Sequence, residues 1–336
     1  MQLRRLGKTG LQVAVIGFGG IPIQRVSSDQ AVKVVEAAVA GGINFIDTAR
    51  AYTDSESKLG GIIGSHRNKL IIATKSMARS RKDMARDIDT SLREMKTDYI
   101  DIYQLHNVKD EGSLEKVLAP GGALEALQDA RSSGKIRFIG VTGHIAQILV
   151  KVIGTGQFDT VQVPFNPVEI AALDELLPLA RDLDMGTIAM KPFAGGAFKN
   201  RTACLKFIIE NGFTTAIPGM DEVSQVAENI AAGQIDSELS GEEKSLLDEE
   251  TELLGRKFCR RCEYCQPCPR GIDIPTIFLL QGYSTRYGLQ EWAVERYRPM
   301  PAKISDCADC GQCEEKCPYS LPIREMLKEA GTYLEK

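Results

Sequence analysis

Short apolar runs alternate with amphipathic stretches through the first two thirds of the chain. The apolar runs are rich in β-branched residues, which is typical of buried strands; they span residues 11–20, 43–46, 70–74, 99–105, 136–141, 160–163, 187–190 and 214–217. The intervening stretches repeat apolar residues at helical spacing; they span about 28–40, 55–65, 80–95, 121–133, 144–155, 170–183, 200–211 and 221–232. A cap at Ser28 or Asp29 is expected to begin the first helix.

This alternation predicts eight strand–helix units around a parallel sheet. Eight such units, in a segment of this length, favour an α/β fold of the (β/α)8 or TIM barrel type. The alternative is an open, doubly wound sheet, which would need a glycine fingerprint opening the first helix, and Gly17-Phe-Gly-Gly20 does not supply one. A further helix is predicted over 240–254, where Ser240 and Glu243 resemble a capping box.

The cysteines divide the chain into two parts. Only Cys204 comes before residue 255, inside a helical pattern where it is expected to be buried, and the other eight lie between Cys259 and Cys317. We therefore predict a barrel domain over 1–255 and a small cysteine-rich domain over 256–336. The net charge of -4 provides no basic field for nucleic acid. Without an apolar run long enough for a membrane helix or signal peptide, a cytoplasmic location is expected.

Four titratable residues follow consecutive predicted strands. Asp47 ends the second strand, Tyr52 lies on the loop beyond it, and Lys75 and His106 end the third and fourth strands. In a (β/α)8 barrel the carboxyl ends of the strands form the active-site face, so these four side chains are expected to converge. One lysine after a strand is usually just solvated, but four groups in register are much harder to explain by chance.

The barrel segment resembles the aldo-keto reductases. The resemblance is carried by Gly7-Lys-Thr-Gly10, Asn44-Phe-Ile-Asp-Thr-Ala49, Ser55-Glu56, Ala73-Thr-Lys75, Gln104-Leu-His106, Gly140-Val-Thr142 and Ile217-Pro-Gly219. It implies an NAD(P)H-dependent exchange between a carbonyl, such as an aldehyde, ketone or sugar, and an alcohol. Tyr52 would be the general acid or base, Lys75 would lower its pKa, Asp47 would hold Lys75, and His106 would orient the carbonyl.

The same resemblance implies a coenzyme site. The residues it implies are Gly19, Gly20, Asp47, Thr142, Gly143, Gln162, Met190, Lys191, Pro192, Phe193, Gly195, Gly219, Met220, Gln225, Glu228 and Asn229. Gly143 stands where the family has Asn, and Met190 where many members stack an aromatic ring on the nicotinamide. Gly219 and Gln225 stand where a Lys and an Arg grip the 2′-phosphate. NADP(H) is the family expectation, and NAD(H) stays open.

The C-terminal cysteines form two runs with ferredoxin spacing. Cys259, Cys262, Cys265 and Cys268 are spaced two residues apart, and Cys307, Cys310, Cys313 and Cys317 match the bacterial ferredoxin pattern in full. In two-cluster ferredoxins the fourth cysteine of each run serves the other cluster. By that rule, Cys259, Cys262, Cys265 and Cys317 would hold one [4Fe-4S] cluster, and Cys307, Cys310, Cys313 and Cys268 the second. The alternative is a pair of structural zinc sites.

The complete pattern resembles the aldo-keto reductases that carry a ferredoxin-like tail. Three roles for the clusters stay open, since they could be structural, sense redox state, or exchange electrons with a partner protein. Beside the leading hypothesis of a carbonyl reductase or alcohol dehydrogenase stand two others. In one the barrel binds NADP(H) as a redox sensor, and in the other it is a docking platform for electron transfer. One or two helices are expected over 274–298, between the cysteine runs.

Overall fold

The computed structural model describes residues 1–234 and 238–335. It divides into two compact units. The first consists of residues 1–192 and the described part of 200–243, and the second of residues 193–199 and the chain from Lys244 onward. The sequence-based boundary at residue 255 follows the change in composition, whereas the spatial division falls earlier. Within the described residues, no helix is both long and apolar enough to cross a bilayer.

The first unit is a (β/α)8 barrel, as the sequence predicts. Its parallel strands follow one another in chain order; they are β3 (Phe18–Gly19), β4 (Phe45–Asp47), β5 (Ile71–Ser76), β6 (Ile100–Leu105), β7 (Ile136–Thr142), β8 (Thr160–Pro164), β9 (Gly186–Met190) and β10 (Thr215–Ala216). Parallel bridges join Ile16 to Ala216 and Gly19 to Gly219, so the first strand meets the last. The open-sheet alternative is therefore wrong.

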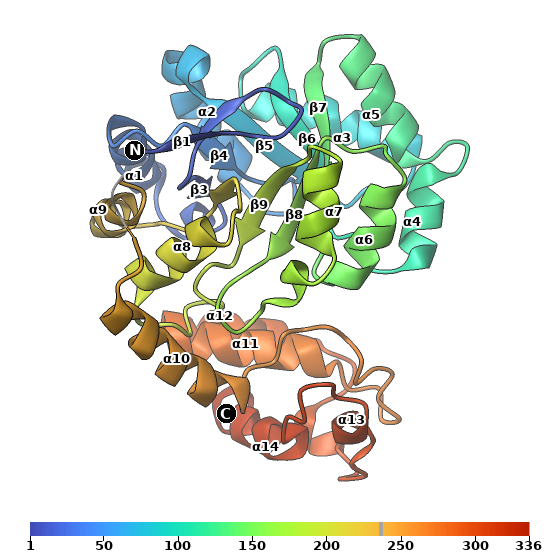
Figure 1. Ribbon diagram of the computed structural model, residues 1–336. Helices are drawn as coiled ribbons and strands as arrows, with labels where there is room; N and C mark the ends of the chain where they lie inside the picture. The colour runs from blue at the N-terminus through green and yellow to red at the C-terminus, as the bar shows by residue number, and fades with distance from the viewer. Residues whose placement is uncertain (235–237, 336) are drawn as a thin grey trace. The chain divides into compact units, whose positions relative to one another are not determined.

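Helices surround these strands in the first unit (Figure 1). They are α1 (Ser28–Ala40), α2 (Ser55–His66), α3 (Arg81–Glu94), α4 (Glu111–Leu118), α5 (Ala123–Ser132), α6 (Ala146–Gly154), α7 (Leu176–Asp182), α8 (Arg201–Glu210) and α9 (Val223–Ala232). Short 3-10 helices cover Pro22–Arg25, Arg67–Lys69 and Ala171–Leu173. The cap of α1 is Ser27, one residue before the predicted start, and its side chain accepts from Gln30 N. Helix α4 was not predicted; it begins at a local capping box between Asp110 and Ser113.

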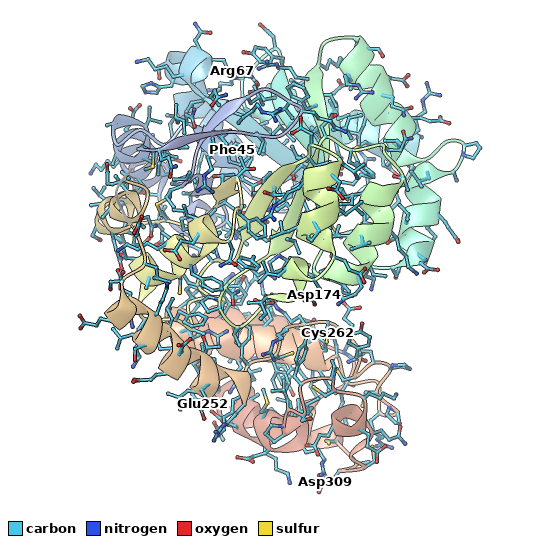
Figure 2. The ribbon with its side chains drawn as sticks, in the orientation of Figure 1. Phe45, Arg67, Asp174, Glu252, Cys262 and Asp309 are labelled. Atoms are coloured by element: carbon cyan, nitrogen blue, oxygen red, sulfur yellow. The ribbon has the colours of Figure 1, made fainter. Side chains whose placement is uncertain are left out.

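The first apolar run is not one strand. Its beginning forms β2 (Gln12–Ala14), which pairs antiparallel with β1 (Leu3–Arg5), and only Phe18–Gly19 enters the barrel. The hairpin buries three apolar side chains against the inward-facing residues of the barrel, which include Phe45 (Figure 2); the cluster consists of Leu6, Leu11, Val13, Phe45, Ala73, Ile102, Ile188 and Ile217. An alternating pattern looks the same in a hairpin and in a barrel strand, so the sequence did not separate them.

The second unit is mainly helical. Helix α10 (Gly241–Gly255) begins at the predicted capping box, in which Glu243 N donates to Ser240 Oγ and Ser240 N donates to the Glu243 carboxylate. The other helices are α11 (Ile274–Tyr287), α12 (Gln290–Tyr297), α13 (Gln312–Glu315) and α14 (Ile323–Leu334), with a 3-10 turn at Ile304–Asp306. Both α11 and α12 lie where helices were predicted. Their apolar faces and that of α14 share one core with several of the cysteines.

Candidate functional site

Lys75 and Asp47 form a buried ion pair at the carboxyl ends of β5 and β4. Lys75 Nζ donates to Asp47 Oδ1 at 2.5 Å and to the Thr48 carbonyl at 2.8 Å. Gln104 Nε2, from β6, donates to the other oxygen of Asp47 at 3.1 Å. Burial lowers the pKa of Lys75 and raises the pKa of Asp47, and their mutual attraction opposes both shifts. The ammonium is therefore fixed in direction by two acceptors.

Tyr52 and His106 lie beside this pair. Lys75 Nζ is 5.2 Å from the centre of the Tyr52 ring. The rings of Tyr52 and His106 meet edge to face, with their centres 6.1 Å apart. Four side chains from β4, the loop after it, β5 and β6 thus come together on one face, as the topology of the barrel led us to expect.

His106 is held as a neutral imidazole. Its burial, together with the positive charges of Lys75, Arg79 and Lys191, lowers the pKa of His106 to about 3. Arg79 Nη2 donates to the carbonyl of His106 at 2.8 Å, which fixes the backbone at the end of β6. Within the described chain, His106 Nδ1 is buried without a hydrogen-bond partner. A neutral ring keeps one N–H donor and one acceptor nitrogen near neutral pH.

A second buried network supports the strand that carries Lys75. The Glu56 carboxylate, from α2, accepts from Thr74 Oγ1 at 2.6 Å and from Ser91 Oγ at 2.8 Å. Arg50 forms an ion pair with the same carboxylate. Thr74 precedes Lys75, so its side chain points to the opposite face of β5. This network therefore holds β5 on the face opposite to Lys75. Glu56, which belongs to one of the motifs of the sequence, therefore has a structural role in which Arg50 balances its charge.

The ends of β7 and β8 present Thr142, Gly143 and Gln162. Asn107 N donates to Thr142 Oγ1 at 2.9 Å, and Gln162 Oε1 accepts from Gln104 Nε2 at 3.1 Å. A Cβ on Gly143 would lie 2.8 Å from the Val108 carbonyl oxygen. A side chain at position 143 would therefore have to displace the backbone of the loop after β6, which already occupies this space.

Three glycines of the predicted coenzyme site mark close backbone approaches. A Cβ on Gly19 would meet the Ile217 carbonyl oxygen at 2.7 Å, and one on Gly20 would meet the Asp47 carbonyl oxygen at 2.9 Å. A Cβ on Gly219 would meet Pro22 Cγ at 2.6 Å. A side chain at position 219 would therefore require Pro22 to move.

The adenine side of the predicted site lies around α9. Gln225 holds Asp221 by two hydrogen bonds, and Arg25 Nη2 lies 3.0 Å from the Asp221 carboxylate. Asn229 is buried, and its Oδ1 has no partner within the described residues. Of the other two predicted residues, Met220 is buried and Glu228 is exposed, 3.5 Å from Arg201.

The end of β9 carries Met190 and Lys191. Lys191 has a left-handed backbone, with φ of 56°. Its Nζ lies 2.8 Å from His144 Nδ1, and its carbonyl accepts from Asn166 Nδ2 at 3.0 Å. Pro192 is buried within the first unit. Phe193 and Gly195, which complete the predicted set, belong to the second unit.

The cysteine runs meet in the second unit. Cys259, Cys262, Cys265 and Cys317 line one cavity together with Phe278 and Tyr319; Cys262 is labelled in Figure 2. Burial and nearby thiols raise the pKa of Cys259 to about 11. In the described chain no three cysteines stand as close as the ligands of a single metal ion. Cysteine sulfurs that surround a cavity, as these do, suit a multi-atom cluster better than one zinc ion.

The second run is less enclosed. Cys313 lies near Cys307, whose charge contributes to the raised pKa of Cys313 after burial and Glu314. Cys310 is exposed, and Cys268 is half buried at the edge of the core of this unit. Cys204 lies buried in α8 of the first unit, as predicted. The first ligand group is thus the better defined of the two.

Comparison with known proteins assigns the first unit. The aldo/keto reductase family model matches residues 15–203. L-galactose dehydrogenase of Arabidopsis thaliana is 31% identical over 283 residues, which cover 69% of this chain and 88% of that protein. The chain belongs to the aldo/keto reductase family. A second relative is the 6-dehydroglucose reductase of Novosphingobium aromaticivorans, which is 29% identical over 68% of this chain and 80% of its own.

Solved aldo/keto reductase structures agree with this assignment. One from Klebsiella pneumoniae, in complex with NADP and acetate, is 27% identical, has a TM-score of 0.62, and covers 74% of this chain and 94% of its own. One from Bacillus halodurans, at 21% identity and a TM-score of 0.64, shares the fold. A 4Fe-4S dicluster domain model matches residues 258–322, so this aldo/keto reductase carries a C-terminal iron–sulfur domain.

Sequence reasoning missed several residues around the aldo/keto reductase site. Gln104 was noted only as part of a motif, yet it joins Asp47 to Gln162. Arg79 and Asn166 hold the ends of β6 and β9 through backbone carbonyls. Such partners could not be found by motif, because a hydrogen bond to a carbonyl requires only that a donor be near.

Proposed function

We propose that the protein is an NADP(H)-dependent oxidoreductase that interconverts a carbonyl and an alcohol, with Tyr52 as general acid and base. NAD(H) is the second candidate coenzyme. The observation that carries the proposal is the position of the Lys75 ammonium, which is buried between the Asp47 carboxylate and the Tyr52 ring. A cation held beside a phenol favours the phenolate that remains after proton donation.

The chain's own groups then have distinct tasks. When bound, the nicotinamide supplies the hydride for the carbonyl carbon or accepts it from the alcohol. In reduction, Tyr52 gives its hydroxyl proton to the carbonyl oxygen, so the substrate gains a hydride and a proton and becomes an alcohol. Lys75 stabilises the phenolate, and neutral His106 donates a hydrogen bond to the same oxygen. Alcohol oxidation uses the reverse transfers, with Tyr52 as the base.

The residues along the predicted coenzyme site fit this role. Gly19 and Gly20 leave the backbone bare where a Cβ would collide with neighbouring carbonyls. Asn229 Oδ1 is buried and unpartnered among the described residues, and a buried acceptor of this kind calls for a donor such as an adenine amino group. Thr142 and Gln162 would hold the carboxamide of the nicotinamide.

Sugar-like carbonyl compounds are the first substrates to try. The two relatives compared above are named for L-galactose and for 6-dehydroglucose. A neutral imidazole and a phenol, His106 and Tyr52, suit a polyhydroxylated aldehyde or lactol, because both side chains can hydrogen-bond to hydroxyl groups. A panel of sugars and small aldehydes would separate this class from simple aliphatic substrates.

A second candidate function concerns the iron–sulfur domain. The cavity lined by Cys259, Cys262, Cys265 and Cys317 supports a cluster within the second unit. A hydride carries two electrons and a cluster takes one at a time, so direct transfer between them would need a flavin, for which the sequence has no motif. Redox sensing or exchange with a partner protein is therefore the alternative role. Bleaching of the visible cluster absorbance by the one-electron reductant dithionite, but not by NADPH, would favour that role.

The decisive experiment compares two tyrosine variants. Tyr52→Phe should lower carbonyl reduction at least about 100-fold, the usual scale of a lost general acid, while coenzyme binding is unchanged. Tyr103→Phe is the matched control, because it removes a buried hydroxyl that hydrogen-bonds to Ser91 on the outer side of the barrel. Full activity of Tyr52→Phe against aldehydes and sugars would rule out the proposed acid.

A further inference from the structure

Arg260 and Tyr319 form a stacked pair at the wall of the first cysteine cavity. The guanidinium carbon of Arg260 lies 3.9 Å from the centre of the Tyr319 ring. A planar guanidinium that stacks on an aromatic face has a defined position. Both side chains line the cavity of the first ligand group, which lies within the second unit and consists of Cys259, Cys262, Cys265 and Cys317.

Two cysteines of this group carry the stacked pair. Arg260 directly follows Cys259, and Tyr319 stands two residues after Cys317. Cys259 comes from the first cysteine run and Cys317 from the second, so the stack joins the two chain segments that supply this group. A cluster held by these ligands therefore has the guanidinium beside it.

Arg260 is the main fixed charge at this wall. Apart from the cysteines, the described residues that line the cavity include two with charged side chains, Arg260 and Glu263. Arg260 is half buried, whereas Glu263 is exposed. Water and salt screen an exposed charge more strongly than a partly buried one. The field that the wall presents to the cavity is therefore positive.

The arginine beside the second cysteine run is placed differently. Arg324 lies 2.8 Å from the Glu314 carboxylate and 3.4 Å from the Asp309 carboxylate. These two carboxylates balance its positive charge. A positive bias is therefore expected at the first ligand group and not at the second.

Charge beside an iron–sulfur cluster affects how readily the cluster takes an electron. One added electron increases the negative charge of a [4Fe-4S] cluster by one unit, with no bond made or broken and no proton transferred. A cation held nearby stabilises the added charge. Because arginine keeps its proton at any working pH, this contribution does not change with pH.

We propose that Arg260, held in place by Tyr319, raises the reduction potential of the cluster bound by the first ligand group. The inference goes beyond the function proposed above, because it concerns the one-electron chemistry of the iron–sulfur domain and not the hydride chemistry of the barrel. Arg260 makes this cluster easier to reduce for any one-electron donor.

The test is a redox titration of the full-length, cluster-loaded protein with dithionite and mediators, followed by electron paramagnetic resonance and visible absorbance. Arg260→Gln should lower one of the two midpoint potentials by about 59 mV, a tenfold loss in the equilibrium constant for one-electron reduction, and leave the other unchanged. Arg260→Lys, which keeps the charge without the planar stack, should cause a smaller fall in the same potential.

Tyr319→Leu tests the stack without removing the charge. The released guanidinium moves into water, where it is screened, so the same potential should fall by less than in Arg260→Gln. Tyr319→Phe keeps the aromatic face and should titrate like the wild-type protein. Arg296→Gln is the matched control, because it removes an arginine that stacks 3.6 Å over Trp292, and neither of these two residues lines the cavity.

The outcomes separate a charge effect from damage to the fold. A fall in one potential in Arg260→Gln and Tyr319→Leu, with iron content and circular dichroism unchanged, supports the proposal. If both variants titrate like the wild-type protein, the proposal is refuted, while the rate of NADPH oxidation still tests the barrel chemistry separately. Equal falls in both potentials also refute it, because the effect would not be local to the first ligand group. If Arg260→Gln loses iron, Tyr319→Leu decides by the same comparison.

Discussion

Replacement of Lys75 by methionine isolates the charge on which the proposed chemistry depends. Methionine fills much of the same space but carries no ammonium. The Lys75 ammonium donates to Asp47 Oδ1 at 2.5 Å and lies 5.2 Å from the centre of the Tyr52 ring. The variant therefore removes one cation from beside the phenol and leaves the hydroxyl of Tyr52 in place. Any effect on the rate then reports on that charge.

The expected size follows from Coulomb's law. Two unit charges 5.2 Å apart, taking the ring centre as the site of the phenolate charge, interact by about 3 kcal/mol at an effective dielectric constant of about 20. A transition state that develops between half and all of this charge would lose about 1.5 to 3 kcal/mol. Lys75→Met should therefore lower the rate of carbonyl reduction roughly 15- to 200-fold.

Stability must be measured beside activity, because the substitution leaves Asp47 buried without its partner. Breaking a buried pair costs about 3 to 5 kcal/mol, whereas removing both charges costs less. The double variant Asp47→Asn/Lys75→Met should therefore unfold at a higher temperature than Lys75→Met, yet remain as slow. Lys206→Met is the matched control, since Lys206 Nζ pairs with Glu243 at 2.7 Å away from the strand ends.

The assay is single-turnover reduction of a reactive aldehyde under saturating coenzyme, followed by loss of NADPH absorbance. A rate for folded Lys75→Met within about threefold of wild type would refute the electrostatic role of Lys75, because threefold is well below the smallest loss calculated. If the double variant regains activity together with thermal stability, the slow rate of Lys75→Met was caused by destabilisation of the fold and not by loss of the charge.

Three further predictions concern pH, coenzyme choice and metal content. Folding lowers the pKa of His106 from 6.5 to about 3, so the unfolded chain binds a proton at a higher pH than the folded chain. The free energy of unfolding of the wild type should therefore fall by about 2 to 3 kcal/mol as the pH is lowered to 4.5. Denaturant titrations of His106→Gln should not show this decrease. A side chain at Gly219 would require Pro22 to move, and Gln225 is hydrogen-bonded to Asp221. The preference for NADP(H) over NAD(H) should therefore be weak. A ratio of the two dissociation constants above about 1,000 would contradict this. Protein purified anaerobically should contain about eight iron and eight sulfide ions per chain. Cys317→Ala should lose about half of this iron, whereas the control Cys204→Ala should keep all of it. Zinc in place of iron would contradict the prediction.

The sequence by itself determined the barrel and which residues stand at the ends of its strands. Alternating strand and helix patterns fix a parallel sheet, and a parallel sheet brings every strand's carboxyl end to one face. The proximity of Asp47, Lys75 and His106 could therefore be predicted from the positions at which three apolar runs end. The cysteine spacing likewise carried the iron–sulfur prediction, because ligands two residues apart are positioned locally.

Only the tertiary structure decided which side chains have room and which donors find acceptors. The space at Gly143 is taken by the Val108 carbonyl and that at Gly219 by Pro22, residues far away in the chain. The hydrogen bond from Arg286 to Gly195 joins residues 91 positions apart. No local pattern encodes such pairs, because steric exclusion and carbonyl hydrogen bonds depend on position in space rather than on a motif.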